Sequence, residues 1–243
     1  MFSASTPIVV YPRVQYIYRG ADINAVYGAI GTALAAALFR KKEIVRLLLD
    51  RGADINAVGG TYGTALAAAA SIGDKEMVSL LLDRGADINA VGGTYGTALV
   101  AAAVMWKEEM VSLLLDRGAD INAVGGTFGT ALTAAAFIRE KKIVSLLLDR
   151  GADINAVGGA HGTALAAAAF TGEEEMVSLL LDGGADIDAV GGTYGTALAM
   201  AVSQNNRKVA LLLLRRGADV MRVGGSFPTA SGQQSRRNPP WAT

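Results

Sequence analysis

Hydrophobic and polar positions repeat every 33 residues along most of this chain of 243 residues. The sequence Gly-Ala-Asp-Ile-Asn, or a close variant of it, begins at Gly20, Gly52, Gly85, Gly118, Gly151, Gly184 and Gly217. Only the first interval differs, by being one residue shorter. A fixed period of this length is typical of a stacked array, in which each unit buries its apolar face against its neighbours. The pattern therefore predicts a single elongated solenoid.

Each repeat is predicted to contain two short helices. The alanine-rich run after Thr64 favours a first helix of about two turns that ends near Gly73, with the Thr64 hydroxyl as its N-cap. A second helix is predicted over residues 75–83, ended by Gly85 in the left-handed conformation. The buried stripe of this second helix is predicted to consist of Met77, Val78, Leu81 and Leu82.

The segment that joins one repeat to the next is predicted to be an extended hairpin. Residues 86–96 combine a turn-forming Asp with a Gly-rich tip at residues 91–94. Helices as short as those of this repeat are marginal in isolation. The stability of the protein must therefore come from stacking of the repeats.

Positions that vary between repeats gather at the end of the first helix and in the turn after it. In the middle repeats large apolar residues occupy these positions, and Trp106 stands where other repeats have Gly73 and Gly172. Contiguous exposed apolar surface usually marks an interaction site, and Met and aromatic residues are common anchors. The predicted protein-binding residues are Ile72, Val104, Met105, Trp106, Phe137, Ile138, Phe170 and Thr171. The alternative, that these side chains fill space between neighbouring first helices, stays open.

A second row of side chains is formed by one ring in each hairpin. Its members are Tyr62, Tyr95, Phe128, His161, Tyr194 and Phe227. Such a row suits either a stacking platform for a ligand or a tiling role in which each ring packs against the adjoining hairpin. We favour the tiling role, because nearly the same ring recurs in every repeat.

Candidate chemistry is sparse. The Gly-rich tips lack the lysine of a phosphate-binding loop, and the evenly spaced aspartates suit turns rather than acid–base pairs. His161 is the single histidine and there is no cysteine, which disfavours a metal site or a catalytic triad. We therefore predict that the protein is not an enzyme and uses no metal and no cofactor.

Charge is balanced overall but uneven along the chain. Residues 1–51 hold seven Lys and Arg against three Asp and Glu, residues 52–202 hold eight against eighteen, and residues 203–243 hold seven against one. Basic ends beside an acidic middle make end-to-end association conceivable, although a monomer is the expected state. The basic ends lack the density and the aromatic residues of a nucleic-acid surface, so no nucleic acid is expected as a partner.

No apolar run approaches the length of a membrane span, and the N-terminus does not resemble a signal peptide. The absence of cysteine fits a reducing compartment. The sequence therefore predicts a cytoplasmic protein with no membrane partner.

The repeat resembles a known family. The period of 33, the order helix–helix–hairpin, and the sequences L-L-L-D-R-G-A-D-I-N-A and T-A-L-A-A-A are similar to the ankyrin repeat over residues 20–226. The resemblance implies an all-α ankyrin-repeat solenoid of about six complete helix pairs. It also implies a non-catalytic scaffold or interaction module that binds a protein partner on its concave face, where the variable positions would lie.

The chain departs from the family pattern in several places. The family sequence T-P-L-H is T-A-L-A at residues 64–67, so the histidine that ties family repeats together is missing. Residues 1–19 are predicted to be a degenerate half-repeat and residues 227–243 a disordered tail. The variant G-G-x-Y-G-x-A-L looks most like ankyrin arrays of filamentous fungi, which often follow a switch domain in larger intracellular receptors. This likeness implies an alternative function, that of a regulatory or sensor fragment whose switch domain is missing.

Overall fold

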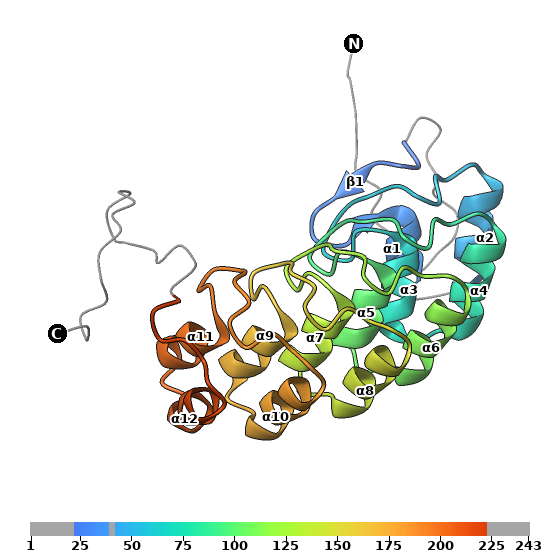
Figure 1. Cartoon of the computed structure of the whole chain (residues 1–243). Helices are drawn as coiled ribbons and strands as arrows, with labels where there is room; N and C mark the ends of the chain where they lie inside the picture. Colours follow the sequence, from blue (N-terminus) through green and yellow to red (C-terminus); the bar gives the residue numbers. More distant parts are fainter. Residues whose placement is uncertain (1–21, 39–41, 223–243) are drawn as a thin grey trace, which may run out of the picture.

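Pairs of short helices are stacked side by side in a curved row in the computed structural model, which describes residues 22–38 and 42–222 (Figure 1). The first helices of the pairs are α1 (Ala33–Ala37), α3 (Ala65–Ile72), α5 (Ala98–Val104), α7 (Ala131–Phe137), α9 (Ala164–Thr171) and α11 (Ala197–Ser203). The second helices are α2 (Lys42–Asp50), α4 (Lys75–Asp83), α6 (Glu108–Asp116), α8 (Lys141–Asp149), α10 (Glu174–Asp182) and α12 (Arg207–Arg215). The described residues therefore confirm the predicted all-α solenoid with six helix pairs.

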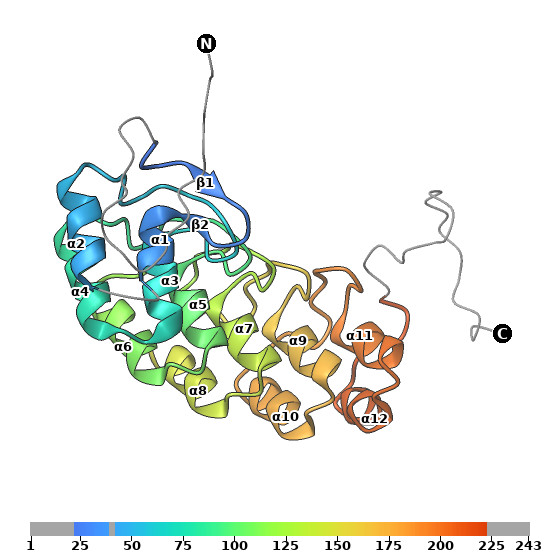
Figure 2. The same ribbon diagram turned by 180° about the vertical axis from the view of Figure 1, so that it is seen from behind.

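The two sets of helices form two layers, and the hairpins project beside the layer of first helices (Figure 2). Every first helix begins after a threonine in extended conformation, whose hydroxyl accepts a hydrogen bond from the backbone N–H three residues later. These N-caps are Thr32, Thr64, Thr97, Thr130, Thr163 and Thr196. The predicted capping role of threonine is confirmed, without the histidine of the family pattern.

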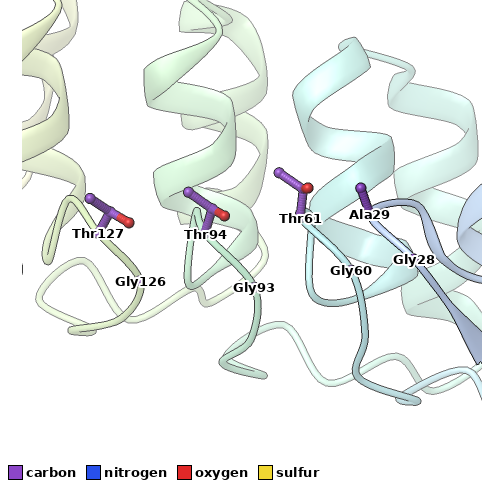
Figure 3. A pocket seen from close by; sticks show the side chains of 8 residues that line it. All are labelled: Gly28, Ala29, Gly60, Thr61, Gly93, Thr94, Gly126 and Thr127. Atoms are coloured by element: carbon purple, nitrogen blue, oxygen red, sulfur yellow. The ribbon is translucent and has the colours of Figure 1, made fainter.

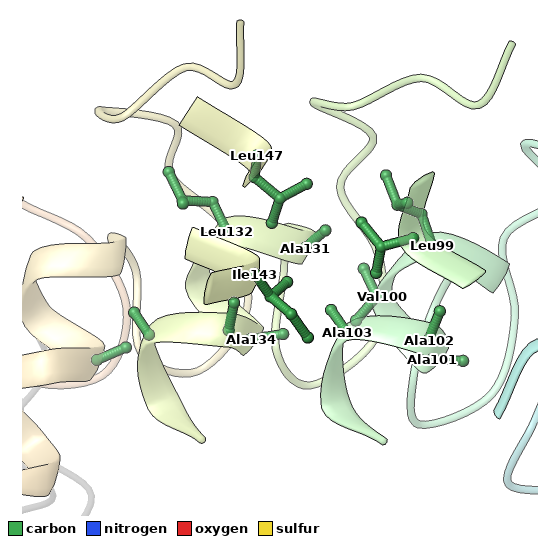
Figure 4. Close-up of a cluster of buried hydrophobic side chains, with 14 of the residues drawn as sticks. Leu99, Val100, Ala101, Ala102, Ala103, Ala131, Leu132, Ala134, Ile143 and Leu147 are labelled. Carbon is green, nitrogen blue, oxygen red and sulfur yellow. The ribbon is translucent and has the colours of Figure 1, made fainter. Parts of the chain in front are cut away.

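The core lies between the two layers (Figure 4). Leu99 and Leu132 of the first helices and Ile143 and Leu147 of α8 are almost fully buried there. Alanines fill most of the remaining first-helix positions, and their small side chains let neighbouring first helices pack closely. The repeats are thus held together by continuous apolar contact along the row.

The second helices bury a narrower stripe than predicted. In α4, Met77, Val78 and Leu81 are buried as expected, whereas Leu82 is only half-buried. Each helical residue turns by about 100°, so Leu82 is carried off the face that Leu81 presents to the core. The predicted bounds of this helix and the left-handed conformation of Gly85, with a φ of +90°, are confirmed.

The hairpins contain very little regular strand. β1 (Val26–Tyr27) and β2 (Gly31–Thr32) pair antiparallel, with Val26 opposite Thr32 and Tyr27 opposite Gly31. Each of the next five hairpins keeps one antiparallel bridge, such as that between Gly92 and Gly96. The turn therefore lies at residues 93–95, later than the predicted tip at residues 91–94.

Successive hairpin tips are joined by a column of backbone hydrogen bonds. The N–H of Thr94 donates to the carbonyl of Thr61 over 2.7 Å, and the N–H of Thr127 donates to the carbonyl of Thr94 over 2.8 Å. The same bond joins Thr61 to Ala29, Ala160 to Thr127 and Thr193 to Ala160. A Cβ atom on Gly96 or Gly129 would overlap the backbone of the next hairpin. The glycines of the tips therefore allow backbone to pack against backbone.

A second column runs through the Asp and Asn residues of the repeat. The Asp87 carboxylate accepts a hydrogen bond from the N–H of Asn89 over 2.9 Å, which confirms the predicted turn role of the aspartates. The side-chain oxygen Oδ1 of Asn56 accepts a hydrogen bond from the N–H of Asp87 in the next repeat over 2.8 Å. This link recurs along the array and was not predicted from the sequence.

Ion pairs connect neighbouring second helices on the outer surface. Lys75 pairs with Glu109 and Lys141 with Glu175, and in each case the hydrogen bond from lysine lowers the pKa of the glutamate. Arg84, Arg150 and Arg216, which follow second helices, each pair with the aspartate of the preceding repeat, as in Arg150 with Asp116 at 2.9 Å. Exposed ion pairs contribute little to the free energy of folding. Their main effect is to align neighbouring second helices.

Some predictions fall on residues that the structure does not describe. The half-repeat at residues 1–19, the tail at residues 227–243 and the ring of Phe227 all lie outside the described residues. No helix among the described residues is long and apolar enough to cross a membrane.

Candidate functional site

The eight predicted binding residues lie at the C-terminal ends of four successive first helices. Five of them belong to α3, α5, α7 and α9, Met105 and Ile138 directly follow α5 and α7, and Trp106 comes after Met105. Their exposure differs along the row. Ile72 and Trp106 are exposed, Trp106 to 67%, whereas the others are half-buried.

The two rows predicted separately from the sequence meet in one aromatic cluster. The Phe137 ring lies 5.5 Å from Phe128, 4.6 Å from His161 and 5.7 Å from Phe170, measured between ring centroids. Tyr62, Tyr95 and Phe128 extend the cluster toward the N-terminal repeats, with centroids 5.6 and 6.4 Å apart. We call this set the aromatic ridge; its members are Tyr62, Tyr95, Phe128, Phe137, His161 and Phe170.

Contacts within the aromatic ridge bury part of the Phe137 and Phe170 side chains. Contacts between rings of this geometry stabilise packing beyond the area that they bury. Phe137 and Phe170 therefore tie adjacent first helices to the hairpins, which agrees with the tiling role favoured for the hairpin rings. Their other side remains accessible to solvent, so packing within the array does not use the whole of the row.

His161 lies between Phe137 and Phe170, with its ring centroid 4.6 and 5.0 Å from theirs. Burial lowers the pKa of His161 below its ordinary value, which favours the neutral ring. Within the described residues, no group of three or more His, Asp or Glu side chains forms a metal site. A neutral imidazole enclosed by two phenyl rings is suited to packing.

The burial of His161 makes the stability of the fold depend on pH. Because the pKa is lowered in the folded state, the unfolded chain takes up a proton on this ring below pH of about 6.5 while the folded chain resists it. The stability that the neutral His161 ring provides is fully present above about pH 6.5. It is lost as the pH falls toward the pKa of this ring in the folded protein. Replacing His161 by Phe, the residue at the equivalent position 128, should reduce the loss of stability between pH 7.5 and pH 5. Urea unfolding at both pH values measures this difference, and an unchanged loss would contradict it.

In the five helix pairs from α3 to α12, the turn between the two helices contains a left-handed residue. Gly73 and Gly172 supply it with φ of +86° and +75°, but Trp106, Arg139 and Asn205 adopt it with φ of +59°, +67° and +56°. A bulky residue in this conformation costs about 1 kcal/mol or more relative to glycine. Strain of this kind is concentrated at functional sites. Trp106 combines this strained conformation with the largest exposed fraction among the eight predicted binding residues.

Polar side chains from the preceding and the following repeat cover the C-terminal end of one first helix, α9. Arg139 Nη2 donates to the carbonyl oxygen of Thr171 over 2.7 Å. Asn206 Nδ2 donates to the carbonyls of Ala169 and Phe170, each over 2.8 Å. Neither residue was singled out from the sequence, because both bonds join residues that are more than 30 positions apart.

A shallow groove follows the hairpin tips beside this row (Figure 3). Its volume is about 600 Å³, and its lining consists of Gly28, Ala29, Gly60, Thr61, Gly93, Thr94, Gly126 and Thr127. The threonine side chains stand in line from one hairpin to the next. Backbone, methyl and hydroxyl groups line the groove, so it offers hydrogen bonds but no titratable group for acid–base chemistry.

Comparison with known proteins agrees with this architecture. A family model described as ankyrin repeats (3 copies) matches residues 11–92, 33–125, 66–158 and 132–223. Among curated proteins, no relative is similar enough to match. The overlapping family matches extend over most of the sequence and coincide with the stacked helix pairs and hairpins described above. The chain therefore belongs to the ankyrin-repeat family.

Proposed function

We propose that this protein is a non-catalytic module that binds a protein partner on its concave face, at the C-terminal ends of the middle first helices. Ankyrin repeats are in general protein–protein interaction modules. The observation that carries the proposal is Trp106, an exposed indole held in a conformation that glycine adopts in two other repeats. Trp106 is 67% exposed, and glycine adopts the same turn without this strain.

The neighbours of Trp106 support the same role. Met105 precedes it, and Ile72 and Ile138 occupy the corresponding ends of the adjacent first helices. Tryptophan and methionine are frequent anchors in protein interfaces, because they bring a large contact area. Phe137 and Phe170 of the same row are held by ring contacts within the aromatic ridge, and a rigid surface loses less entropy on binding.

Trp106 allows stability and binding to be separated in one experiment. Replacing Trp106 by Gly should raise the free energy of unfolding by about 0.5–1 kcal/mol, because it relieves the left-handed strain. The same change should weaken binding of the partner by about tenfold or more, since it removes the central anchor. Urea unfolding measures the first effect, and quantitative affinity purification from the native cell, followed by titration of the captured protein, measures the second.

Asn205 provides a matched control. It occupies the equivalent turn in the same conformation, with a φ of +56°, but lies among polar residues at the end of the row. Replacing Asn205 by Gly should stabilise the fold less than Trp106→Gly, because asparagine adopts the left-handed conformation more readily, and should leave the captured proteins unchanged. Recovery of the same partners at the same affinity by the Trp106→Gly variant would contradict the proposed site.

A further inference from the structure

Each inner helix pair has one face covered by the next repeat. In the last described pair, α11 and α12, the corresponding face is exposed, and we call it the end face (Figures 1 and 2). Val202 of α11 is 53% exposed, whereas the equivalent alanines of the inner repeats are completely buried. On α12, Leu211 is 53% and Leu214 41% exposed. We define the end face as Val202, Arg207, Leu211, Leu214, Arg215 and Met221.

The end face differs chemically from the surfaces that stack inside the array. Leu211 stands where the four preceding repeats have serine, at Ser79, Ser112, Ser145 and Ser178. Arg215 stands where every other second helix ends in aspartate, at Asp50, Asp83, Asp116, Asp149 and Asp182. Met221 replaces the residue whose side chain accepts the hydrogen bond from the next repeat, at Asn56, Asn89, Asn122, Asn155 and Asp188.

These replacements remove the contacts that a further repeat of this pattern would need. In the array, Asp182 accepts from Arg216 of the next repeat over 2.9 Å, so Arg215 in the same place would meet an arginine. Met221 offers no oxygen for the link that Asp188 makes to Asp219. A valine at position 202 is also larger than the alanine that fits between neighbouring first helices. The face is therefore poorly suited to another copy of the repeat.

What remains is an exposed apolar centre between cations. Leu211 and Leu214 lie on one side of α12, with Arg207 toward its beginning and Arg215 at its end. Met221 adds a side chain that is 76% exposed. An apolar patch bounded by arginines matches a partner that carries both apolar side chains and carboxylates, since guanidinium groups bind carboxylates in a two-point geometry.

The charge of this chain disfavours its own segments as occupants. Residues 223–243 contain two arginines and no acidic residue. Residues 1–51, which a second copy would bring in an end-to-end contact, hold seven basic residues against three acidic ones. Either segment would add positive charge to a positive face, which like-charge repulsion opposes.

We propose that the end face is a docking surface, separate from the concave face, for an acidic segment of a protein partner. Apolar side chains of that segment contact Leu211 and Leu214, and its carboxylates pair with Arg207 and Arg215. This site does not depend on Trp106 or on the proposed concave-face partner.

Synthetic peptides test this directly on the full chain. The probe is an amphipathic helical peptide with leucines on one face and glutamates on the other, and its control has glutamine in place of every glutamate. The glutamate peptide should bind in fluorescence anisotropy, and raising the salt concentration from about 0.05 to 0.5 M should weaken it several-fold through screening. The glutamine peptide should bind about tenfold more weakly or not at all.

The matched protein variant restores the residues of the inner repeats. Combining Leu211→Ser with Arg215→Asp should retain the fold, since both residues occur at these positions elsewhere in the array, and should weaken the glutamate peptide by about tenfold or more. The Trp106→Gly variant should bind the peptide unchanged, which separates this test from that of the concave face. Absence of binding, equal binding of the glutamine peptide, or full binding by the double variant would overturn the proposal.

Two further measurements identify a different occupant. Sedimentation with phosphatidylserine vesicles that depends on Leu211 and Arg215 would assign the face to a lipid surface. A molar mass that rises with concentration in wild type but not in the double variant would assign it to a second copy. Either result would replace the acidic protein segment as the occupant and overturn the proposal.

Discussion

Replacing Gly129 by Ala should lower the free energy of unfolding by about 3 kcal/mol or more, or abolish folding of the array. Gly129 has a φ of +78°, and a Cβ atom there would overlap the backbone of Gly158 in the next hairpin. The alanine methyl group would overlap backbone atoms, which cannot rotate away as a side chain can. The two hairpins would therefore have to separate, which would break the hydrogen bonds between their tips. Urea unfolding followed by circular dichroism measures the loss.

Gly118 gives the matched control for this prediction. Its φ of +90° is also left-handed, but nothing lies within 4 Å of a Cβ atom built there. Gly118→Ala should therefore cost only the conformational strain, about 1–2 kcal/mol. Equal destabilisation by the two substitutions would mean that the close approach of the hairpins contributes nothing.

Replacing Leu114 by Ala should cost about 2–5 kcal/mol, the range found for large-to-small changes in a close-packed core. Leu114 is completely buried in α6, where it belongs to the stripe that joins the two helix layers. Because each repeat contacts only its neighbours, the cavity should weaken the stacking of the middle repeats and broaden the unfolding transition. Urea unfolding compared with wild type gives both the midpoint and the slope.

Phe137→Ala is the informative companion to the Leu114 variant. Phe137 contacts three rings of the aromatic ridge but is only half-buried. Its removal should cost about 2 kcal/mol, between the small effect of surface changes and the 3–5 kcal/mol typical of a fully buried phenylalanine. A cost equal to that of Leu114→Ala would make Phe137 a core residue and remove it from the candidate binding surface.

Local patterns were sufficient to predict most of the secondary structure. The threonine caps, the span of α4 from Lys75 to Asp83 and the left-handed Gly85 depend on residues within one or two turns of each other. Capping hydrogen bonds and helix propensity act over that distance, so they are visible in the sequence of one repeat. The 33-residue period then predicted the stacking, because each unit leaves an apolar face that only a neighbour covers.

The candidate site was predicted only in part. The sequence placed the variable apolar residues at the ends of the first helices, and the structure has them there. It did not show that Phe137 and Phe170 join the hairpin rings, that Asn56 links one repeat to the next, or that Trp106 is strained. Trp106 aligns with Gly73 and Gly172, but the tryptophan side chain itself gives no sign of a left-handed turn.

The sequence by itself determined the repeat, its two helices, its caps and the order in which they are stacked, since these follow from local hydrogen bonding and from a periodic apolar pattern. Only the tertiary structure decided which side chains share a surface. The aromatic ridge and the backbone column of the tips join residues about one repeat apart, and the end face exposes positions that the inner repeats cover. The contacts between repeats depend on how closely neighbouring repeats approach. Small glycine and alanine residues allow the close approach, and the curvature of the stack determines the distance.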